Sequence, residues 1–291
     1  FDEKKDKWRI LRVLKLIIYL KNKRFDTVFF IQRSFTRIFL CFLARIPERI
    51  GYRRLKTYPL LTKTISPPAS TVHRQNYYLE LFRKNGIPIK NTIPRILPPE
   101  SKIKHYTFFV RNLKKKYSCI AGINPSANWK LKRWPAKNFS ALAQELSAKF
   151  NCAVFLFGTR KDCGIAEEVV KGCSEQIYNF CGKTDLNGLI ALLSFVDVFI
   201  SADSGPAHLV SALNKPTIVI FGPTSEEITA PRGLKTETLR MHNSCSLPCY
   251  VLDCPDNVCM KMVKVEDVLS KVKKLINHEL QNPDKFSYKH R

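Results

Sequence analysis

The second half of the chain alternates short apolar runs with longer amphipathic stretches. The runs that predict strands lack polar alternation: CIAGIN (119–124), CAVFLF (152–157), QIYN (176–179), DVFIS (197–201) and TIVIF (217–221). The spacing of apolar residues between them predicts helices over 136–150, 162–173, 186–195, 206–213 and 265–280. Buried strands separated by helices are typical of a parallel sheet that is covered on both faces. This half is therefore expected to be a doubly wound α/β domain, with its ligand beyond the carboxyl ends of the strands.

The first half has a less regular pattern. It predicts helices over 8–24, 33–45 and 73–86, and strands over 26–32 and 49–52. Prolines at positions 88, 94, 98 and 99 indicate an extended linker near residues 87–105. We therefore expect a first domain with its linker over residues 1–105 and a second domain over residues 106–291.

The positive charge is concentrated in the first half. Residues 1–116 hold 28 Lys and Arg against 7 Asp and Glu, a net +21, whereas residues 117–291 hold 21 against 17, a net +4. Such a surface favours a polyanionic partner, which could be nucleic acid, an anionic membrane or a phosphorylated substrate. The alternative is a solvated basic surface with no partner.

Two absences in the sequence bear on location. The apolar runs are shorter than the roughly 18 residues that a membrane-spanning helix needs, and no signal-peptide pattern is found. We expect a cytoplasmic protein. Because the chain begins with Phe1 rather than Met, we also expect its N-terminus to be incomplete.

The ten cysteines form two groups. Without a secretory signal, disulfides are not expected, and the six scattered cysteines are predicted to be buried thiols: Cys41, Cys119, Cys152, Cys163, Cys173 and Cys181. The other four form a C-x3-C-x4-C-x4-C cluster: Cys245, Cys249, Cys254 and Cys259. Four thiols suffice for tetrahedral zinc, but this spacing is not the paired CxxC. We predict no metal site and favour packed or redox-labile thiols, with zinc as the alternative.

The segment DVFISADSGPAH (197–208) combines a buried strand with the start of a helix. The free N–H groups of the first helical turn form an anion site, Ser204 can donate to a phosphate oxygen, and Gly205 lets a ligand approach the backbone. The alternative is that Asp203 or Ser204 only caps the helix. His208 lies one turn further on and is a second candidate, although a lone histidine is as often a core residue.

Two more strands end in loops with candidate chemistry. The segment GINPSANWKLKRWP (122–135) carries three cations and two tryptophans, and a lysine here can neutralise charge on a departing diphosphate. A solvated basic loop is the alternative. The segment FGPTS (221–225) continues the predicted anion-binding rim, with ordinary turn chemistry as its alternative. GKT (182–184) is not a Walker A loop, because Ile177 stands where the required glycine would be. GxGxxG is also absent, which counts against kinases, ATPases and standard dehydrogenases.

Taken together in this order, four segments resemble glycosyltransferase family 9, the ADP-heptose:lipopolysaccharide heptosyltransferases. They are NPSANWKLKRWP (124–135), FCGKTDL (180–186), ISADSGPAHLVSAL (200–213) and IVIFGPT (218–224). The first half matches more loosely through RFDTVFFIQRS (24–34), RIGY (49–52) and YYLELFRKNGI (77–87). The resemblance implies two Rossmann-like domains in the GT-B arrangement, the N-terminal one incomplete, and an inverting transfer without an essential metal or other cofactor.

The resemblance also implies roles for individual residues. Lys132 would neutralise the donor diphosphate with Asn128 beside it, and residues 180–183 would lie near the base. The donor site would be lined by Asp203, Ser204, Gly205 and His208. Asp162 is a weaker candidate for the ribose. The family's catalytic base lies on an N-terminal Gly-Asp turn that residues 1–30 do not match, so no base is identified and we expect it in a missing N-terminal part.

The sequence thus predicts transfer of a sugar, heptose by resemblance, from a nucleotide diphosphate to a lipopolysaccharide core or similar anionic lipid-linked acceptor. The basic first half would face that acceptor at the cytoplasmic surface of the inner membrane. Two alternatives stay open: a non-catalytic sugar-nucleotide-binding remnant and a basic nucleic-acid-binding protein. We expect no nucleic-acid partner, because the sequence lacks zinc-finger, RNP and helix-turn-helix signatures.

Overall fold

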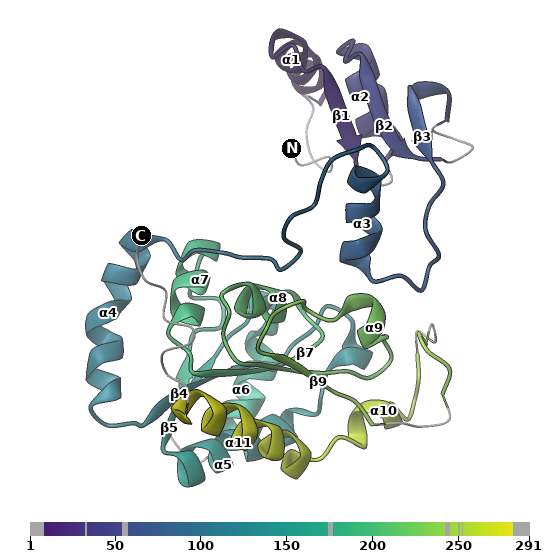
Figure 1. Cartoon of the computed structure of the whole chain (residues 1–291). Helices are drawn as coiled ribbons and strands as arrows, with labels where there is room; N and C mark the ends of the chain where they lie inside the picture. The colour runs from purple at the N-terminus through teal and green to yellow at the C-terminus, as the bar shows by residue number, and fades with distance from the viewer. Residues whose placement is uncertain are drawn as a thin grey trace. The chain divides into compact units, whose positions relative to one another are not determined.

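The computed structural model (Figure 1) describes residues 9–32, 34–53, 58–173, 177–241, 245–249, 251 and 253–281. The chain forms two compact units, Phe1–Thr92 and Ile93–Arg291. In both units the described strands are parallel and are joined by helices. Across the described residues, no helix has the length and apolar character needed to cross a bilayer.

The first unit contains a three-stranded sheet in the order β1-β2-β3. The strands are β1 (Thr27–Phe30), β2 (Glu48–Tyr52) and β3 (Lys63–Ile65). The helices are α1 (Arg9–Asn22), α2 (Phe35–Leu43), the short 3-10 turn Tyr58–Leu60, and α3 (Arg74–Arg83). The three predicted helices and two predicted strands are confirmed, and β3 was missed because three residues carry little periodicity.

Strand alternation divides this unit's core between the two faces of its sheet. Phe29 packs on one face with Tyr77 and Leu81 of α3. Its neighbours Val28 and Phe30 point to the other face, where they pack with α1 and α2. The sheet is therefore covered by α3 on one face and by the pair α1 and α2 on the other.

The second unit contains a six-stranded sheet in the order β6-β5-β4-β7-β8-β9. The strands are β4 (Cys119–Asn124), β5 (Cys152–Leu156), β6 (Ile177–Asn179), β7 (Val198–Ala202), β8 (Thr217–Ile220) and β9 (Thr236–Leu239). The longer helices are α4 (Glu100–Lys114), α5 (Ala136–Phe150), α6 (Cys163–Lys171), α7 (Leu186–Ser194), α8 (Gly205–Ala212) and α11 (Val265–Gln281). Short turns complete the unit: Lys130–Lys132, Arg160–Asp162, α9 (Glu226–Thr229) and α10 (Val258–Lys261).

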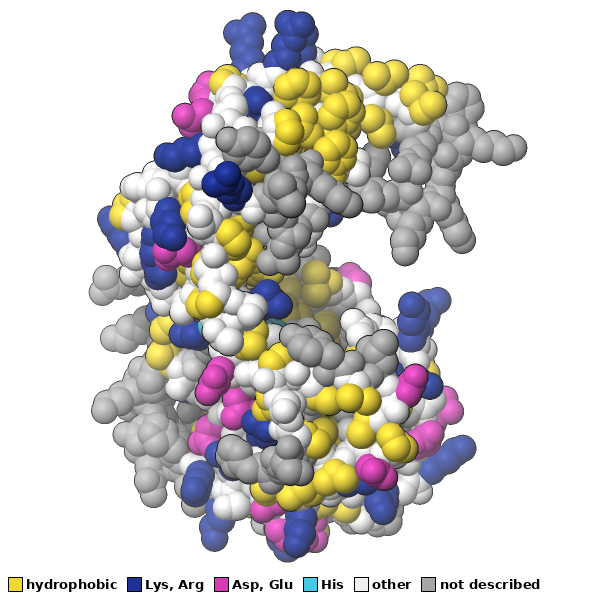
Figure 2. Space-filling model, turned by 90° about the vertical axis from the view of Figure 1, so that its right-hand side faces the viewer, with side chains coloured by type: hydrophobic (Ala, Val, Ile, Leu, Met, Phe, Trp, Pro, Cys, Tyr) yellow, Lys and Arg dark blue, Asp and Glu magenta, His cyan; other side chains and the backbone are white. Residues whose placement is uncertain are grey.

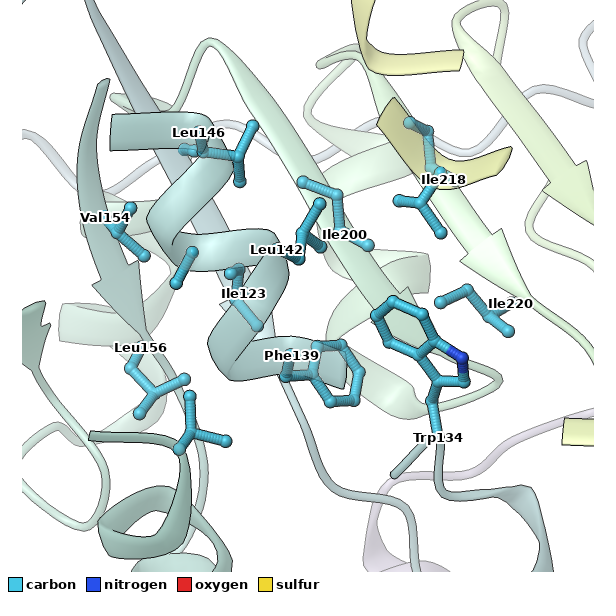
Figure 3. Close-up of a cluster of buried hydrophobic side chains, with 14 of the residues drawn as sticks. Ile123, Trp134, Phe139, Leu142, Leu146, Val154, Leu156, Ile200, Ile218 and Ile220 are labelled. Atoms are coloured by element: carbon cyan, nitrogen blue, oxygen red, sulfur yellow. The ribbon is translucent and has the colours of Figure 1, made fainter. Parts of the chain in front are cut away.

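Both faces of this sheet are buried, as the apolar strands predicted. On one face, Leu142 and Leu146 of α5 and Val272 of α11 pack against Ile123 and Ile200 (Figure 3). On the other face α4, α7 and α8 pack against the alternate strand residues. The predicted doubly wound α/β class is confirmed.

Trp134 is the largest fully buried side chain of this core. Its ring packs edge-on against Phe139, with the ring centroids 4.9 Å apart, and its indole N–H donates to the Val263 carbonyl at 2.8 Å. It therefore anchors the loop after β4 to the core and to the segment that leads into α11.

Three features of the second unit differ from expectation. Strand β9 was not predicted from the sequence. Helix α4 begins at Glu100, inside the stretch expected to be extended. The prolines at 98 and 99 precede its first turn, where a missing N–H removes no helical hydrogen bond. Cys119 and Cys152, expected to be free thiols, are joined as a disulfide. They form a register pair on β4 and β5 with Cα atoms 4.5 Å apart, a proximity that their separation of 33 residues does not reveal.

We predict that Trp134→Ala lowers the free energy of unfolding of the second unit by about 3–5 kcal/mol, because it removes a buried ring and leaves a carbonyl without its donor. Urea unfolding followed by circular dichroism measures the loss. Phe108→Ala is the control, since Phe108 is 77% exposed and should change the free energy by less than about 0.5 kcal/mol. Equal losses in the two variants would contradict the anchoring role.

Candidate functional site

A cavity of 1120 Å³ lies at the carboxyl edge of the second unit's sheet. Its walls come from residues 124–132, 158–162, 182–189 and 203–208, together with Thr229. These loops follow β4, β5, β6 and β7, whose parallel arrangement brings all their carboxyl ends to one edge. The strand order reverses its direction between β4 and β7, which is where doubly wound sheets bind ligands.

An ion pair joins two of the loops that line this cavity. Lys132 Nζ donates to Asp203 Oδ2 at 2.7 Å, and the Thr224 hydroxyl donates to the same oxygen at 2.8 Å. The Asp203 side chain is only 7% exposed and that of Lys132 is 23% exposed. A carboxylate this deeply buried requires a charged partner. The pair therefore fixes the position of a cation in the wall of the cavity.

A hydroxyl network shapes the start of α8. The side-chain amide of Asn124 donates to the Ser204 hydroxyl at 3.0 Å, and the hydroxyls of Ser204 and Ser201 are 2.7 Å apart. Ser204 is the N-cap residue of α8, but within the described structure its side chain makes no capping hydrogen bond. Asp203 is likewise engaged elsewhere. The capping alternative for these two residues is therefore not supported, and neither side chain caps the first turn of α8.

Gly205 opens that first turn. A Cβ placed on Gly205 would have no atom within 4 Å, and the residue is an exposed part of the cavity wall. A side chain here would thus occupy space that a ligand could use rather than clash with the protein. His208, one turn further along α8, is exposed and lines the same cavity.

Asp162 joins the loops after β4 and β5. One carboxylate oxygen accepts from the Ser126 hydroxyl, and the other accepts from the Thr159 amide at 2.8 Å and its hydroxyl at 2.6 Å. Burial raises the pKa of Asp162, but the hydrogen bonds from Ser126 and Thr159 and the nearby charge of Arg133 outweigh it, so the pKa falls below its usual value. Asp162 lines the cavity while holding two of its loops together.

The structure brings most of the predicted site residues into one cavity wall. Those that line it are Asn128, Lys132, Asp162, Asp203, Ser204, Gly205 and His208. From the 221–225 segment, Thr224 reaches Asp203 and supports it, but that segment is not part of the lining. Within residues 180–183, Gly182 and Lys183 line the cavity, whereas Phe180 stacks on Phe157 with the ring centroids 6.0 Å apart.

Sequence reasoning missed several lining residues. Thr159 and Arg160 follow β5, and Thr184, Asp185 and Leu189 follow β6. The available signal was their place after the carboxyl ends of predicted strands, which applies to these loops as it does to those after β4 and β7. Thr184 and Asp185 belong to the FCGKTDL segment that carries the resemblance, but only residues 180–183 of that segment were assigned a place in the site.

The clustered cysteines are not part of the cavity lining. The Cys249 amide donates to the Pro223 carbonyl at 2.8 Å, and Cys259 Sγ lies 3.2 Å from where a Cβ on Gly222 would stand. Burial raises the pKa of Cys259. In the described parts of the chain, no three His, Cys, Asp or Glu side chains are arranged to hold a metal, so the zinc alternative gains no support.

Comparisons with known proteins agree with this architecture. The sequence model described as glycosyltransferase family 9 (heptosyltransferase) matches residues 13–257. Lipooligosaccharide heptosyltransferase 2 of Campylobacter jejuni serotype O:2 is 29% identical over 274 residues, which cover 91% of this chain and 83% of the relative. The protein with the same description from Haemophilus influenzae is 29% identical over 233 residues, covering 76% of this chain and 67% of the relative.

Solved structures show the same fold. The E. coli ADP-heptose lps heptosyltransferase II superposes with a TM-score of 0.76 at 23% identity, over 93% of this chain and 82% of that one. The glycosyl transferase family 9 protein of Veillonella parvula gives 0.81 at 19% identity, over 94% of this chain and 81% of that one. The expected GT-B-like class is therefore confirmed.

We predict that Asp162→Asn lowers the melting temperature at neutral pH, because the amide accepts the Ser126 and Thr159 hydrogen bonds less well than the carboxylate. The folded-state pKa is depressed, so this stabilisation is present above the unfolded-state pKa of about 3.9 and is lost as the pH falls towards the folded value. The gap between wild type and variant should persist at mildly acidic pH and close only in strong acid. Scanning calorimetry across pH measures it. The control Asp253→Asn changes an exposed carboxylate, and a gap that closes at neutral pH would refute the assignment.

Proposed function

The chain belongs to glycosyltransferase family 9, and we propose that it transfers heptose from ADP-heptose to a lipopolysaccharide core or a similar anionic glycolipid. The proposal rests on the Lys132–Asp203 ion pair, which lies next to the N-terminus of α8 in a cavity large enough for a nucleotide sugar. Support for the donor and acceptor comes from the relatives, which are lipopolysaccharide and lipooligosaccharide heptosyltransferases.

Lys132 and the start of α8 together suit a diphosphate. The ammonium group supplies a full positive charge, and the first-turn N–H groups add oriented donors at the positive end of the helix. Ser204 adds a hydroxyl, and Gly205 leaves room for a phosphate to approach the backbone. An incoming diphosphate would share Lys132 with Asp203, whose carboxylate keeps the ammonium in place before the donor binds.

The proposed reaction is a displacement at the anomeric carbon. The acceptor oxygen forms a bond to the anomeric carbon while the bond between that carbon and the ADP oxygen breaks. This displacement inverts the configuration at the anomeric carbon. The acceptor proton passes to a carboxylate base, and no residue of this chain is assigned that role. The negative charge that develops on the ADP leaving group is met by Lys132 and the start of α8.

Three further residues have proposed roles in donor binding. Asn128, from the loop after β4, and His208, from α8, both line the cavity and offer hydrogen-bonding groups to the donor. Asp162 is proposed to act near the ribose. Because both of its oxygens already accept hydrogen bonds from the protein, its main contribution would be to hold the rim in shape.

The first unit is proposed to face the acceptor. Residues 1–92, which form the first unit, hold 21 Lys and Arg against 6 Asp and Glu, and this net charge of +15 complements the phosphates of an anionic glycolipid and of the surrounding bilayer. We therefore propose action at the cytoplasmic face of the inner membrane. The nucleic-acid alternative is not favoured, because the family match extends from residue 13 across most of this basic half.

We predict that ADP raises the melting temperature of the chain, with about 2.7 kcal/mol of stabilisation at a hundredfold excess over its Kd. Lys132→Ala and Asp203→Ala should cut that stabilisation by at least about half at the same ADP concentration, because the first removes the phosphate cation and the second removes its anchor. Differential scanning fluorimetry measures the shift, and isothermal calorimetry measures the Kd, which should weaken roughly tenfold or more for Lys132→Ala.

Lys130→Ala is the matched control for Lys132→Ala. Lys130 belongs to the same short turn but is exposed and is not part of the cavity lining, so this variant should bind ADP as the wild type does. A wild-type chain that shows no shift with any nucleoside diphosphate would refute the donor site.

Sugar transfer separates an active enzyme from a non-catalytic remnant. With ADP-heptose and a heptose-deficient lipopolysaccharide acceptor, release of ADP is the expected result. Lys132→Ala should lower kcat by roughly 10²–10³-fold, because the leaving-group charge loses its partner in the transition state. ADP binding without transfer would support the remnant instead.

A further inference from the structure

Helix α1 carries apolar side chains on its outer side as well as its inner side. Ile17 and Leu20 pack inward with Cys41 and Ala44. Ile10, Leu14 and Ile18, spaced four residues apart, form a stripe on another face, and Leu11 lies beside it; all four are exposed, Ile10 at 76%. A helix whose second apolar face is open to water is not explained by packing within its own unit.

Helix α2 repeats this arrangement with aromatic residues. Phe35, Phe39 and Phe42 occupy positions i, i+4 and i+7 and are all exposed, with Leu43 beside them. Their rings stack along the helix, with centroids 6.0 Å apart for Phe35 and Phe39 and 6.4 Å apart for Phe39 and Phe42. The ladder is therefore an ordered outer surface rather than a scatter of single side chains.

The two stripes belong to the same side of the first unit. Helices α1 and α2 pack against each other and cover the same face of the sheet, whereas α3 covers the opposite face. Figure 2 shows hydrophobic side chains gathered on the part of the surface that belongs to this unit, with Lys and Arg side chains near them. We call this surface the α1–α2 face and define it by the following residues: Ile10, Leu11, Leu14, Ile18, Phe35, Phe39, Phe42 and Leu43.

The segment that carries the α1–α2 face is strongly basic. Residues 9–46 contain nine Lys and Arg against one acidic residue, Asp26. The cations include Lys15 and Lys21 on α1 and Arg37 on α2, which are all exposed. A protein partner that covered only the apolar side chains would leave this charge unanswered. A bilayer that contains anionic lipids supplies both an apolar layer and a negative surface.

We propose that the α1–α2 face is a docking surface for an anionic phospholipid bilayer. At 14 residues α1 is too short to span the membrane, so it lies in the plane of the interface with Ile10, Leu14 and Ile18 in the headgroup and acyl boundary. The phenylalanines of α2 insert beside them, and the lysines and arginines contact lipid phosphates. The proposal deepens the proposed function, because it names the surface through which the enzyme meets the membrane that holds its acceptor.

Vesicle flotation of the full chain tests the proposal. We expect binding to phosphatidylcholine vesicles that contain about a third phosphatidylglycerol, and much weaker binding to phosphatidylcholine alone. The triple variant Phe35→Ser, Phe39→Ser, Phe42→Ser should lower the partition coefficient by at least about tenfold. The control Leu97→Ser, Phe108→Ser removes two side chains of the second unit that are 75% and 77% exposed, and it should bind as the wild type does.

A second pair of changes tests the charge independently of the aromatic ladder. Lys15→Gln with Lys21→Gln should weaken binding to the anionic vesicles and reduce its dependence on salt, because fewer lipid phosphates are neutralised. These side chains are exposed, so the folded state should tolerate the change.

The ADP-induced melting shift is measured for every variant. It distinguishes failure of the docking proposal from failure of the donor-site proposal. A preserved shift shows that the second unit is folded and its donor site intact, so loss of vesicle binding in the triple variant then supports the docking surface. A wild-type chain that does not bind anionic vesicles overturns the docking proposal. A triple variant that binds them as the wild type does also overturns it. Neither result bears on the donor site. Light scattering that shows a wild-type dimer and a monomeric triple variant, neither bound to vesicles, would assign the face to a second copy of the chain instead.

Discussion

The contact between Lys132 Nζ and Asp203 Oδ2 is the interaction on which the site depends. Each residue comes from a different strand end, so the pair exists only while β4 and β7 are neighbours in the sheet. Removing either partner would leave the other charge unpaired in a largely buried position, which is costly. The arrangement therefore requires both partners to be present.

The rest of the second unit keeps those two strand ends in place. The parallel sheet brings the loops to one edge. Trp134 anchors the loop that carries Lys132 to the core through its hydrogen bond to Val263. Thr224, in the loop after β8, donates a hydrogen bond to Asp203. Asp162, in the loop after β5, accepts one from Ser126. These contacts are made by hydrogen bonds of fixed direction, so the cavity is largely formed before any ligand arrives, which lowers the ordering cost of binding.

The first unit differs from the second in how its apolar side chains are buried. Its sheet has one face covered by α3 and the other by α1 and α2, and several large apolar side chains of α1 and α2 stay exposed outside that small core. Apolar side chains spaced along the outside of α1 and α2 add nothing to the stability of this unit in water. They lie in a segment, residues 9–46, that holds nine Lys and Arg against one acidic residue, which is why we propose a membrane as their partner.

Patterns that are local in sequence determined the fold class, the bounds of β4 and α5, and the choice of Lys132, Asp203, Ser204 and His208 as candidates, because strand burial, helix periodicity and motif order are all written along the chain. Tertiary structure alone decided which of the candidates meet. The pairing of Lys132 with Asp203 spans 71 residues, and the cross-strand cysteines lie 33 residues apart. Such contacts follow from sheet order and register, which arise when separate βα units pack on one another and which no single stretch of sequence encodes.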